Sequence, residues 1–344
     1  MRYLLTLAAI SLSSPVAAQQ AEEQVTPASV VAAALPEEWV NIAPEDVLIM
    51  ELAPAADGSG RYVVIQLMPP PFSQPWVENI RTLARAGWWD ELSVYRAVDN
   101  WVVQWGDVSE EKALPEGLAD TEAVPYVSLV SLSAAKDDPK FDPPFQQHNV
   151  IDPYANRRTR TETSTSYEGG LSGFSRGWPV AMLPDYGRPI SVLIAEALEE
   201  PQNFGEIWPI HCYSHVGVAR DIANTGTGTE LYAVIGHAPR QLDRNIAVVG
   251  RVIEGMEFLS TLPRGPGDLG VYESRQEDTP IVSVQLASDH RAGATFAYEY
   301  LDTASESFAR YVDVRANRND DFYTVPAGGV DICNVQVPVR LVAP

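Results

Sequence analysis

Short apolar runs rich in β-branched and aromatic residues recur in two stretches of the chain, and turn-forming residues separate them. Such runs are typical of strands. The loop APAADGSG separates one pair of runs, and Asp99-Asn100 separates another, as hairpins require. The pattern therefore predicts a mainly β protein. The predicted strands cover residues 46–52, 61–68, 92–98, 101–105, 216–220, 231–235, 246–252 and 280–286.

Helical periodicity is confined to a few short segments. In the first of them, Trp76, Ile80 and Leu83 fall on one face, because residues three or four apart share a side of a helix. Ser73 is placed to cap this helix. A strand around Cys333 is expected after the last helix. The predicted helices cover residues 73–86, 253–262 and 304–318.

Between the two ordered stretches, residues 108–210 are polar, rich in proline and acidic in places. A segment of this length is too long for a bare loop, so we expect small elements of its own. Within it, residues 189–200 form the clearest ordered pattern, and RRTRTETSTS at 157–166 is typical of an exposed loop.

The first residues have the pattern of a secretory signal peptide. Arg2 is followed by an apolar run at 4–10, and small residues at 16–18 suit a signal peptidase. The alternative, a membrane anchor, needs a longer apolar run. We therefore expect residues 1–18 to be removed and the protein to be periplasmic or secreted. We expect residues 19–43 to form a flexible N-terminal segment.

The amino-acid composition argues against some classes of binding partner. Lys and Arg total 24 and Asp and Glu total 46, so the net charge is −22. This acidity argues against binding to nucleic acid or anionic lipid. No later stretch is apolar for long enough to insert in a membrane. Cys212 and Cys333 can pair in an oxidising compartment, and two separate buried thiols are the alternative.

Three short motifs resemble known catalytic or ligand-binding patterns, but their surroundings do not match what those sites require. Ser175 lies in GFSRG, a string like the nucleophile elbow of serine hydrolases, but Trp-Pro follows where a helix must start. GPGDLG at 265–270 lacks the strand before it and the helix after it that a dinucleotide site needs. His211, Cys212 and His215 are too few for a zinc site, so two structural histidines beside a disulfide are favoured.

A longer pattern carries more weight. VYRAVDNWVVQWGD, which ends at residue 107, is similar to the F-H-R-V-I-x-x-F-M-x-Q-G-G-D segment of cyclophilin-type peptidyl-prolyl isomerases. In the second half, VAR, TELY, VGRV and IEGM stand where that family has M-A-N/R, S-Q-F-F, F-G-K/R-V and V-x-G-M. The two halves, in the right order, make the resemblance more specific than any single motif.

The resemblance implies a closed eight-stranded antiparallel β-barrel capped by two helices, with a long insertion and a C-terminal extension. Eight strands leave an interior that side chains fill. The expected organisation is a signal peptide at 1–18, a flexible segment at 19–43, a cyclophilin-like domain at 44–290 with an insertion at about 108–210, and an extension at 291–344 packed on the domain.

The resemblance also implies a site. Arg96 would bond the proline amide, and Gln104 would hold Arg96 and contact the peptide backbone. The other implied residues line the proline pocket (Trp101, Val102, Tyr232 and Leu242) or border the neighbouring groove (Ala219 and Arg220). The simpler alternatives are a surface arginine and core aromatics. No cofactor is implied. The expected partners are proline-containing polypeptides, and we expect a monomer.

Departures from the family pattern leave alternatives open. Glu230 replaces a glutamine and can either compete with substrate for Arg96 or hold its guanidinium. Gln241 and Ile246 replace a tryptophan and a histidine, which reshapes the groove. The main interpretation is a peptidyl-prolyl isomerase that assists the folding of exported proteins. A weakly active module that binds Pro-containing peptides is the first alternative, and a serine hydrolase is the second.

Overall fold

The computed structural model describes residues 25–131, 171–184 and 204–342. The predicted signal peptide, the loop at 157–166 and the element at 189–200 lie outside these residues.

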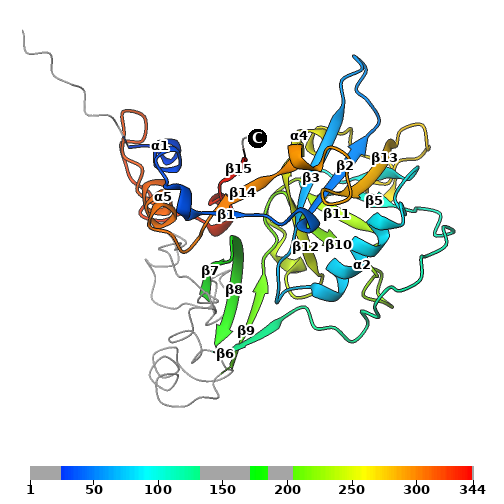
Figure 1. The fold of residues 1–344 in the computed structure, drawn as a ribbon, viewed down its shortest axis with the longest axis horizontal. Helices are drawn as coiled ribbons and strands as arrows, with labels where there is room; N and C mark the ends of the chain where they lie inside the picture. The colour runs from blue at the N-terminus through cyan, green and yellow to red at the C-terminus, as the bar shows by residue number, and fades with distance from the viewer. Residues whose placement is uncertain (1–24, 132–170, 185–203, 343–344) are drawn as a thin grey trace, which may run out of the picture.

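A closed antiparallel β-barrel forms the larger body (Figure 1). Its strand order is β10-β11-β5-β4-β13-β2-β3-β12, and each strand overlaps one of the eight predicted runs. The mainly β class and the closed eight-stranded barrel are therefore confirmed. The barrel strands are β2 (Val47–Leu52), β3 (Arg61–Leu67), β4 (Ser93–Ala97), β5 (Val102–Gly106), β10 (His215–Val218), β11 (Leu231–Val234), β12 (Val248–Glu254) and β13 (Thr279–Leu286).

Two helices pack against this barrel. The apolar face of α2 (Gln74–Arg85) is fully buried and joins the barrel core, as its periodicity predicts. The expected cap is wrong, because Ser73 has a φ of 53° and its side chain makes no capping hydrogen bond. Helix α4 (Met256–Ser260) is shorter than predicted. Gly255, with a φ of 79°, ends β12 beside the Tyr62 carbonyl, which a Cβ at this position would approach to 2.0 Å.

A second body is built from three separate parts of the chain. Residues 25–43, expected to be flexible, instead contain α1 (Pro27–Ala32) and β1 (Trp39–Asn41). Strand β1 pairs with β14 (Tyr298–Leu301), which pairs with β15 (Val339–Leu341). The insertion contributes a four-stranded sheet of β6 (Ser128–Ser131), β9 (Phe204–Pro209), β8 (Trp178–Pro184) and β7 (Leu171–Ser175). Among the described residues, the 3-10 helices are η1 (Pro36–Glu38), η2 (Pro44–Asp46), η4 (Arg240–Leu242), η5 (Asp268–Gly270), η6 (Gly293–Phe296) and η7 (Ile332–Asn334).

Apolar side chains from all three parts meet in one cluster, which we call the second core. It includes Val30 of α1, Phe174 and Trp208 of the insertion sheet, and Phe308 of α5 (Glu306–Ala316). The rings of Phe174 and Phe308 meet edge to face at 5.0 Å. Helices α1 and α5 lie side by side, away from the barrel (Figure 1). The N-terminal segment is therefore ordered by contacts with the C-terminal part and with the insertion sheet, both of which are distant in the sequence.

The C-terminal part is also bonded covalently to the rest. A disulfide joins Cys212, which precedes β10, to Cys333. Cys333 lies in η7 rather than in the strand expected there. The Asp331 carboxylate accepts a hydrogen bond from the Cys333 amide at 2.8 Å, which favours a tight turn over an extended strand.

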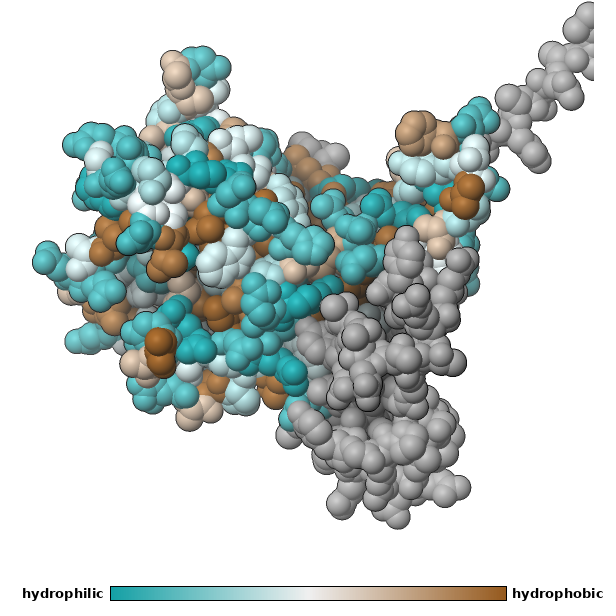
Figure 2. All heavy atoms as spheres, turned by 180° about the vertical axis from the view of Figure 1, so that it is seen from behind, coloured by the Kyte–Doolittle hydropathy of each residue, from teal (hydrophilic) through white to brown (hydrophobic). Residues whose placement is uncertain are grey.

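Seen from behind, hydrophobic residues on the barrel form small separate patches among hydrophilic ones (Figure 2). Such scattered exposure is normal for folded proteins. Within the described ranges, no helix has both the length and the apolar character needed to cross a membrane.

Candidate active site

Two neighbouring strands hold the predicted catalytic pair. Strands β4 and β5 pair with Arg96 opposite Gln104. The Arg96 Nη1 donates to Gln104 Oε1 at 2.7 Å, and its Nε donates to the Leu269 carbonyl at 2.7 Å. The guanidinium carbon lies 5.4 Å from the centre of the Trp101 ring. Two acceptors thus hold the guanidinium at the barrel surface, and none of its hydrogen bonds within the described chain uses Nη2.

Glu230 determines which way the Gln104 amide points. The Gln104 Nε2 donates to Glu230 Oε2 at 3.3 Å, and the Tyr95 hydroxyl donates to the same oxygen at 2.7 Å. The Asp107 backbone amide donates to Glu230 Oε1 at 2.6 Å. Because a carboxylate only accepts hydrogen bonds, the amide nitrogen of Gln104 must face Glu230 and its oxygen must face Arg96.

The described residues contain no ion pair between Arg96 and Glu230. Glu230 therefore acts on Arg96 through Gln104 and does not occupy the guanidinium. Space for its carboxylate depends on Gly106, because a Cβ there would lie 2.0 Å from Glu230 Oε1. Gly106 also has a φ of 151°, which side chains rarely allow.

A pH profile tests this role of Glu230. Burial raises the pKa of Glu230 above its ordinary value, although three hydrogen bonds to the carboxylate oppose the shift. Below that pKa the carboxyl group gains a proton and holds Gln104 less firmly, so isomerase activity is expected to fall several-fold with acidity. Glu230→Gln cannot titrate, so its profile of kcat/KM should be flat in the same range. If kcat/KM of the variant still falls at acidic pH, the titrating group is another one. Circular dichroism at each pH checks that the protein stays folded.

The predicted proline pocket is an apolar cluster beside this network. Buried Val102, Tyr232 and Val234 form its base, and half-buried side chains pack around them. All five apolar residues implied by the resemblance lie in it: Trp101, Val102, Ala219, Tyr232 and Leu242. The sequence analysis missed Val98 and Val234. The alternation of strand residues could have found Val234, since it shares a face of β11 with Tyr232.

Tyr232 brings a polar group to the base of this cluster. Its hydroxyl lies 2.7 Å from His211 Nε2, and His211 Nδ1 lies 2.7 Å from Asp243 Oδ1. All three side chains are buried. A hydroxyl buried without a partner is costly, so the histidine and the aspartate stabilise a tyrosine at this position. Sequence reasoning assigned His211 to the surroundings of the disulfide and missed this link.

The structure also places the remaining candidate residues and motifs. Arg220 is exposed beyond β10 and bonds the Asn245 carbonyl at 2.9 Å, so it borders the apolar cluster at its rim. The glycine-rich segment 265–270 positions Arg96, because the Leu269 carbonyl accepts a hydrogen bond from its Nε. Ser175 is buried beside the tight turn between β7 and β8 and does not begin a helix, so the elbow interpretation is wrong. In the described ranges, no group of three metal-ligating side chains occurs.

The outer surface of the barrel thus carries Arg96, Gln104 and an apolar cluster side by side. Residues 71–286, more than half of the chain, match the model of the family described as cyclophilin type peptidyl-prolyl cis-trans isomerase/CLD. The chain belongs to this family, and it is an isomerase of X–Pro peptide bonds.

One solved structure supports this fold. The chain is similar to cyclophilin AquaCyp293 from Hirschia baltica, with a TM-score of 0.62, 20% identity, and coverage of 93% of this chain and 99% of that one. It also aligns with a cyclophilin type peptidyl-prolyl cis-trans isomerase from Cryptosporidium parvum at a TM-score of 0.36 and 9% identity, covering 70% and 96% of the two chains. No curated protein matches the sequence.

Proposed function

We propose that this isomerase assists the folding of exported proteins by stabilising the twisted X–Pro amide. Rotation about a peptide bond has a barrier of about 18–20 kcal/mol because resonance makes the C–N bond partly double. The two isomers of an X–Pro bond differ by only about 0.5–1 kcal/mol, yet they exchange over tens to hundreds of seconds. A catalyst must therefore lower this barrier and needs no nucleophile or metal.

The Arg96–Gln104–Glu230 network is the observation that carries this mechanism. When the amide twists, its nitrogen regains a lone pair, and a fixed guanidinium donor can bond that nitrogen. Such an interaction is stronger in the twisted state than in either planar isomer, which is the condition for catalysis. The apolar cluster of Trp101, Val102 and Tyr232 would hold the proline ring beside it.

Export is supported by two independent features. The sequence begins with a signal-peptide pattern, and Cys212 and Cys333 form a disulfide, which persists in oxidising compartments. The clients would be newly exported chains with exposed X–Pro bonds.

The proposal predicts processing at the N-terminus. Expressed in a Gram-negative host, the full chain is expected in the periplasmic fraction, with residues 1–18 removed and the disulfide formed. Intact mass spectrometry of the fractions, with and without alkylation of thiols, measures both. A chain lacking residues 1–18 is the control and should remain in the cytoplasm. A full chain that stays there unprocessed would exclude export and leave the isomerase assignment intact.

A further inference from the structure

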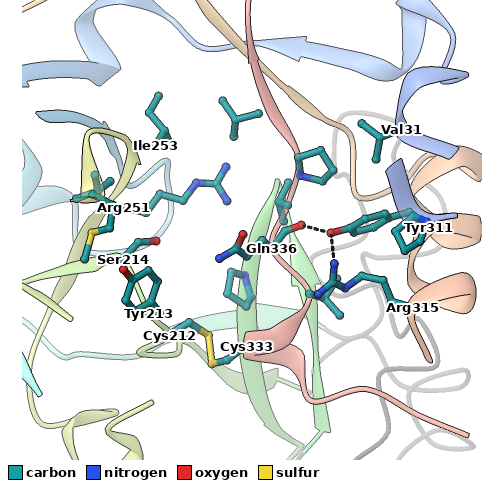
Figure 3. Close-up of a pocket in the computed structure, with 18 of the residues that line it drawn as sticks. Val31, Cys212, Tyr213, Ser214, Arg251, Ile253, Tyr311, Arg315, Cys333 and Gln336 are labelled. Atoms are coloured by element: carbon teal, nitrogen blue, oxygen red, sulfur yellow. Dashed lines mark hydrogen bonds between the residues drawn. A yellow bond between two sulfur atoms is a disulfide. The ribbon is translucent and has the colours of Figure 1, made fainter. Parts of the chain in front are cut away.

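A large pocket lies between the barrel and the second body, lined by residues outside the Arg96 network. Its volume is about 910 Å³, which is large enough for a small organic ligand. One wall comes from the loop before β10 and from β12, and the other comes from α1, α5 and residues 332–339. Figure 3 shows the Arg251 side chain extending from the barrel wall toward Gln336, with Tyr311 and Arg315 on the opposite side.

Arg251 is an unusual group in such a wall. The residue is only 6% exposed. Its Nε donates to Gln66 at 2.9 Å, and its Nη1 donates to the Gly177 carbonyl at 2.8 Å. Its Nη2 is buried and has no hydrogen-bond partner among the described residues, and no carboxylate there forms an ion pair with Arg251. The guanidinium carbon lies 4.6 Å from the centre of the Trp178 ring.

The bond to Gly177 joins the barrel to the insertion sheet, and the bond to Gln66 lies within the barrel, but neither balances the charge. Burial lowers the pKa of Arg251 to about 10, so the group stays protonated at neutral pH. A buried charge without a counter-ion is costly, and leaving its donor unpaired adds to that cost. An anion in the pocket would remove both deficits.

The surrounding groups select among anions. Arg315 lines the pocket and adds positive charge, whereas the charge of Arg318, which also lines it, is balanced by Asp320 at 2.7 Å. Glu254 and Glu257 line the pocket as well and would repel a dianion such as phosphate. Apolar contacts come from Val31, Ile253 and Val337, among others. A single carboxylate on an otherwise apolar body meets both conditions, since guanidinium and carboxylate groups match in geometry.

We propose that this pocket binds an organic carboxylate, with the buried guanidinium of Arg251 as its anchor. The carboxylate would accept from Nη2, and the apolar part of the ligand would lie along α1 and residues 335–339. The same chemistry is found at the C-terminus of a peptide and in a free organic acid.

Calorimetric titration of the mature protein separates these sources. The probes are acetyl-Ala-Leu-Val with a free carboxylate, octanoate, and the amide of each; none contains proline. Binding of at least one acid, tenfold or more tighter than its amide, is expected from a charge-assisted hydrogen bond. Binding of the peptide acid alone would assign a chain terminus, and binding of octanoate alone would assign a free acid. Equal binding of acids and amides, or none by either acid at millimolar concentration, would overturn the proposal.

Variants locate the binding. Ala28 is an exposed residue of α1 that lines the pocket, so Ala28→Trp should block it and abolish acid binding without lowering isomerase activity. Ala56→Trp, at an exposed hairpin turn, is the matched control and should bind normally. Arg251→Gln should remove the preference for acid over amide; if it does not fold, Ala28→Trp still decides. Acid binding unaffected by Ala28→Trp would contradict the assignment.

Discussion

Replacing Arg96 with alanine is expected to lower kcat/KM for an Ala-Pro peptide by about 10- to 150-fold, because the variant loses one charge-assisted hydrogen bond worth about 1.5–3 kcal/mol. The loss should appear in the rate of exchange between isomers. Affinity for the peptide should change little, since the apolar cluster that would bind the proline ring remains. Exchange NMR measures both quantities on one sample and needs no coupling protease.

Two further variants separate charge from geometry. Arg96→Lys keeps the charge, but an ammonium lacks the planar fork that lets Arg96 bond Gln104 and Leu269 at once, so most of the loss should remain. Arg85→Ala, which removes an exposed ion pair with Asp289 at the end of α2, is the control and should be fully active. Full activity of Arg96→Ala in a folded protein would remove Arg96 from the mechanism.

The barrel could be predicted from the sequence because its signals are local. Each strand is a short β-rich run bounded by turn residues, and α2 has a clear apolar face. The second body could not be predicted in this way. Helix α1 and strand β1 carry little pattern of their own, and they are ordered by contacts with α5 and β14, more than 250 residues away. No local pattern can report such a pairing.

The candidate site, like the fold, could be predicted from the sequence only in part. The resemblance named Arg96, Gln104 and the apolar residues because they lie within two continuous motifs, and the structure brings them together. The same motifs left two roles open for Glu230, since its partners lie on β4 (Tyr95), on β5 (Gln104) and directly after β5 (Asp107). The Tyr232–His211–Asp243 link was missed for a related reason. It joins His211 before β10, Tyr232 on β11 and Asp243 after η4, and these residues meet only when the barrel is closed.

A large loss of stability is expected when the Cys212–Cys333 disulfide is removed. The double variant Cys212→Ser/Cys333→Ser is expected to unfold at lower urea concentration, with a loss of at most about 5 kcal/mol. The bond closes a loop with a sequence separation of 121, and a constraint of that length removes much of the entropy of the unfolded chain. Urea titrations followed by fluorescence, on wild type and variant, measure the difference.

The loss should be concentrated in the second body. Its apolar cluster is separate from the barrel core, and Cys212 and the residue next to Cys333, Ile332, belong to it. Amide exchange should therefore accelerate in α5 and β14 before it changes in β2 or β3. Isomerase activity should be retained, because Arg96 and Gln104 lie on β4 and β5 and depend on neither cysteine. A reductant should destabilise the wild type and leave the double variant unchanged, which controls for effects of the substitutions themselves. Equal stability of the two proteins would show that noncovalent contacts alone hold the C-terminal part in place.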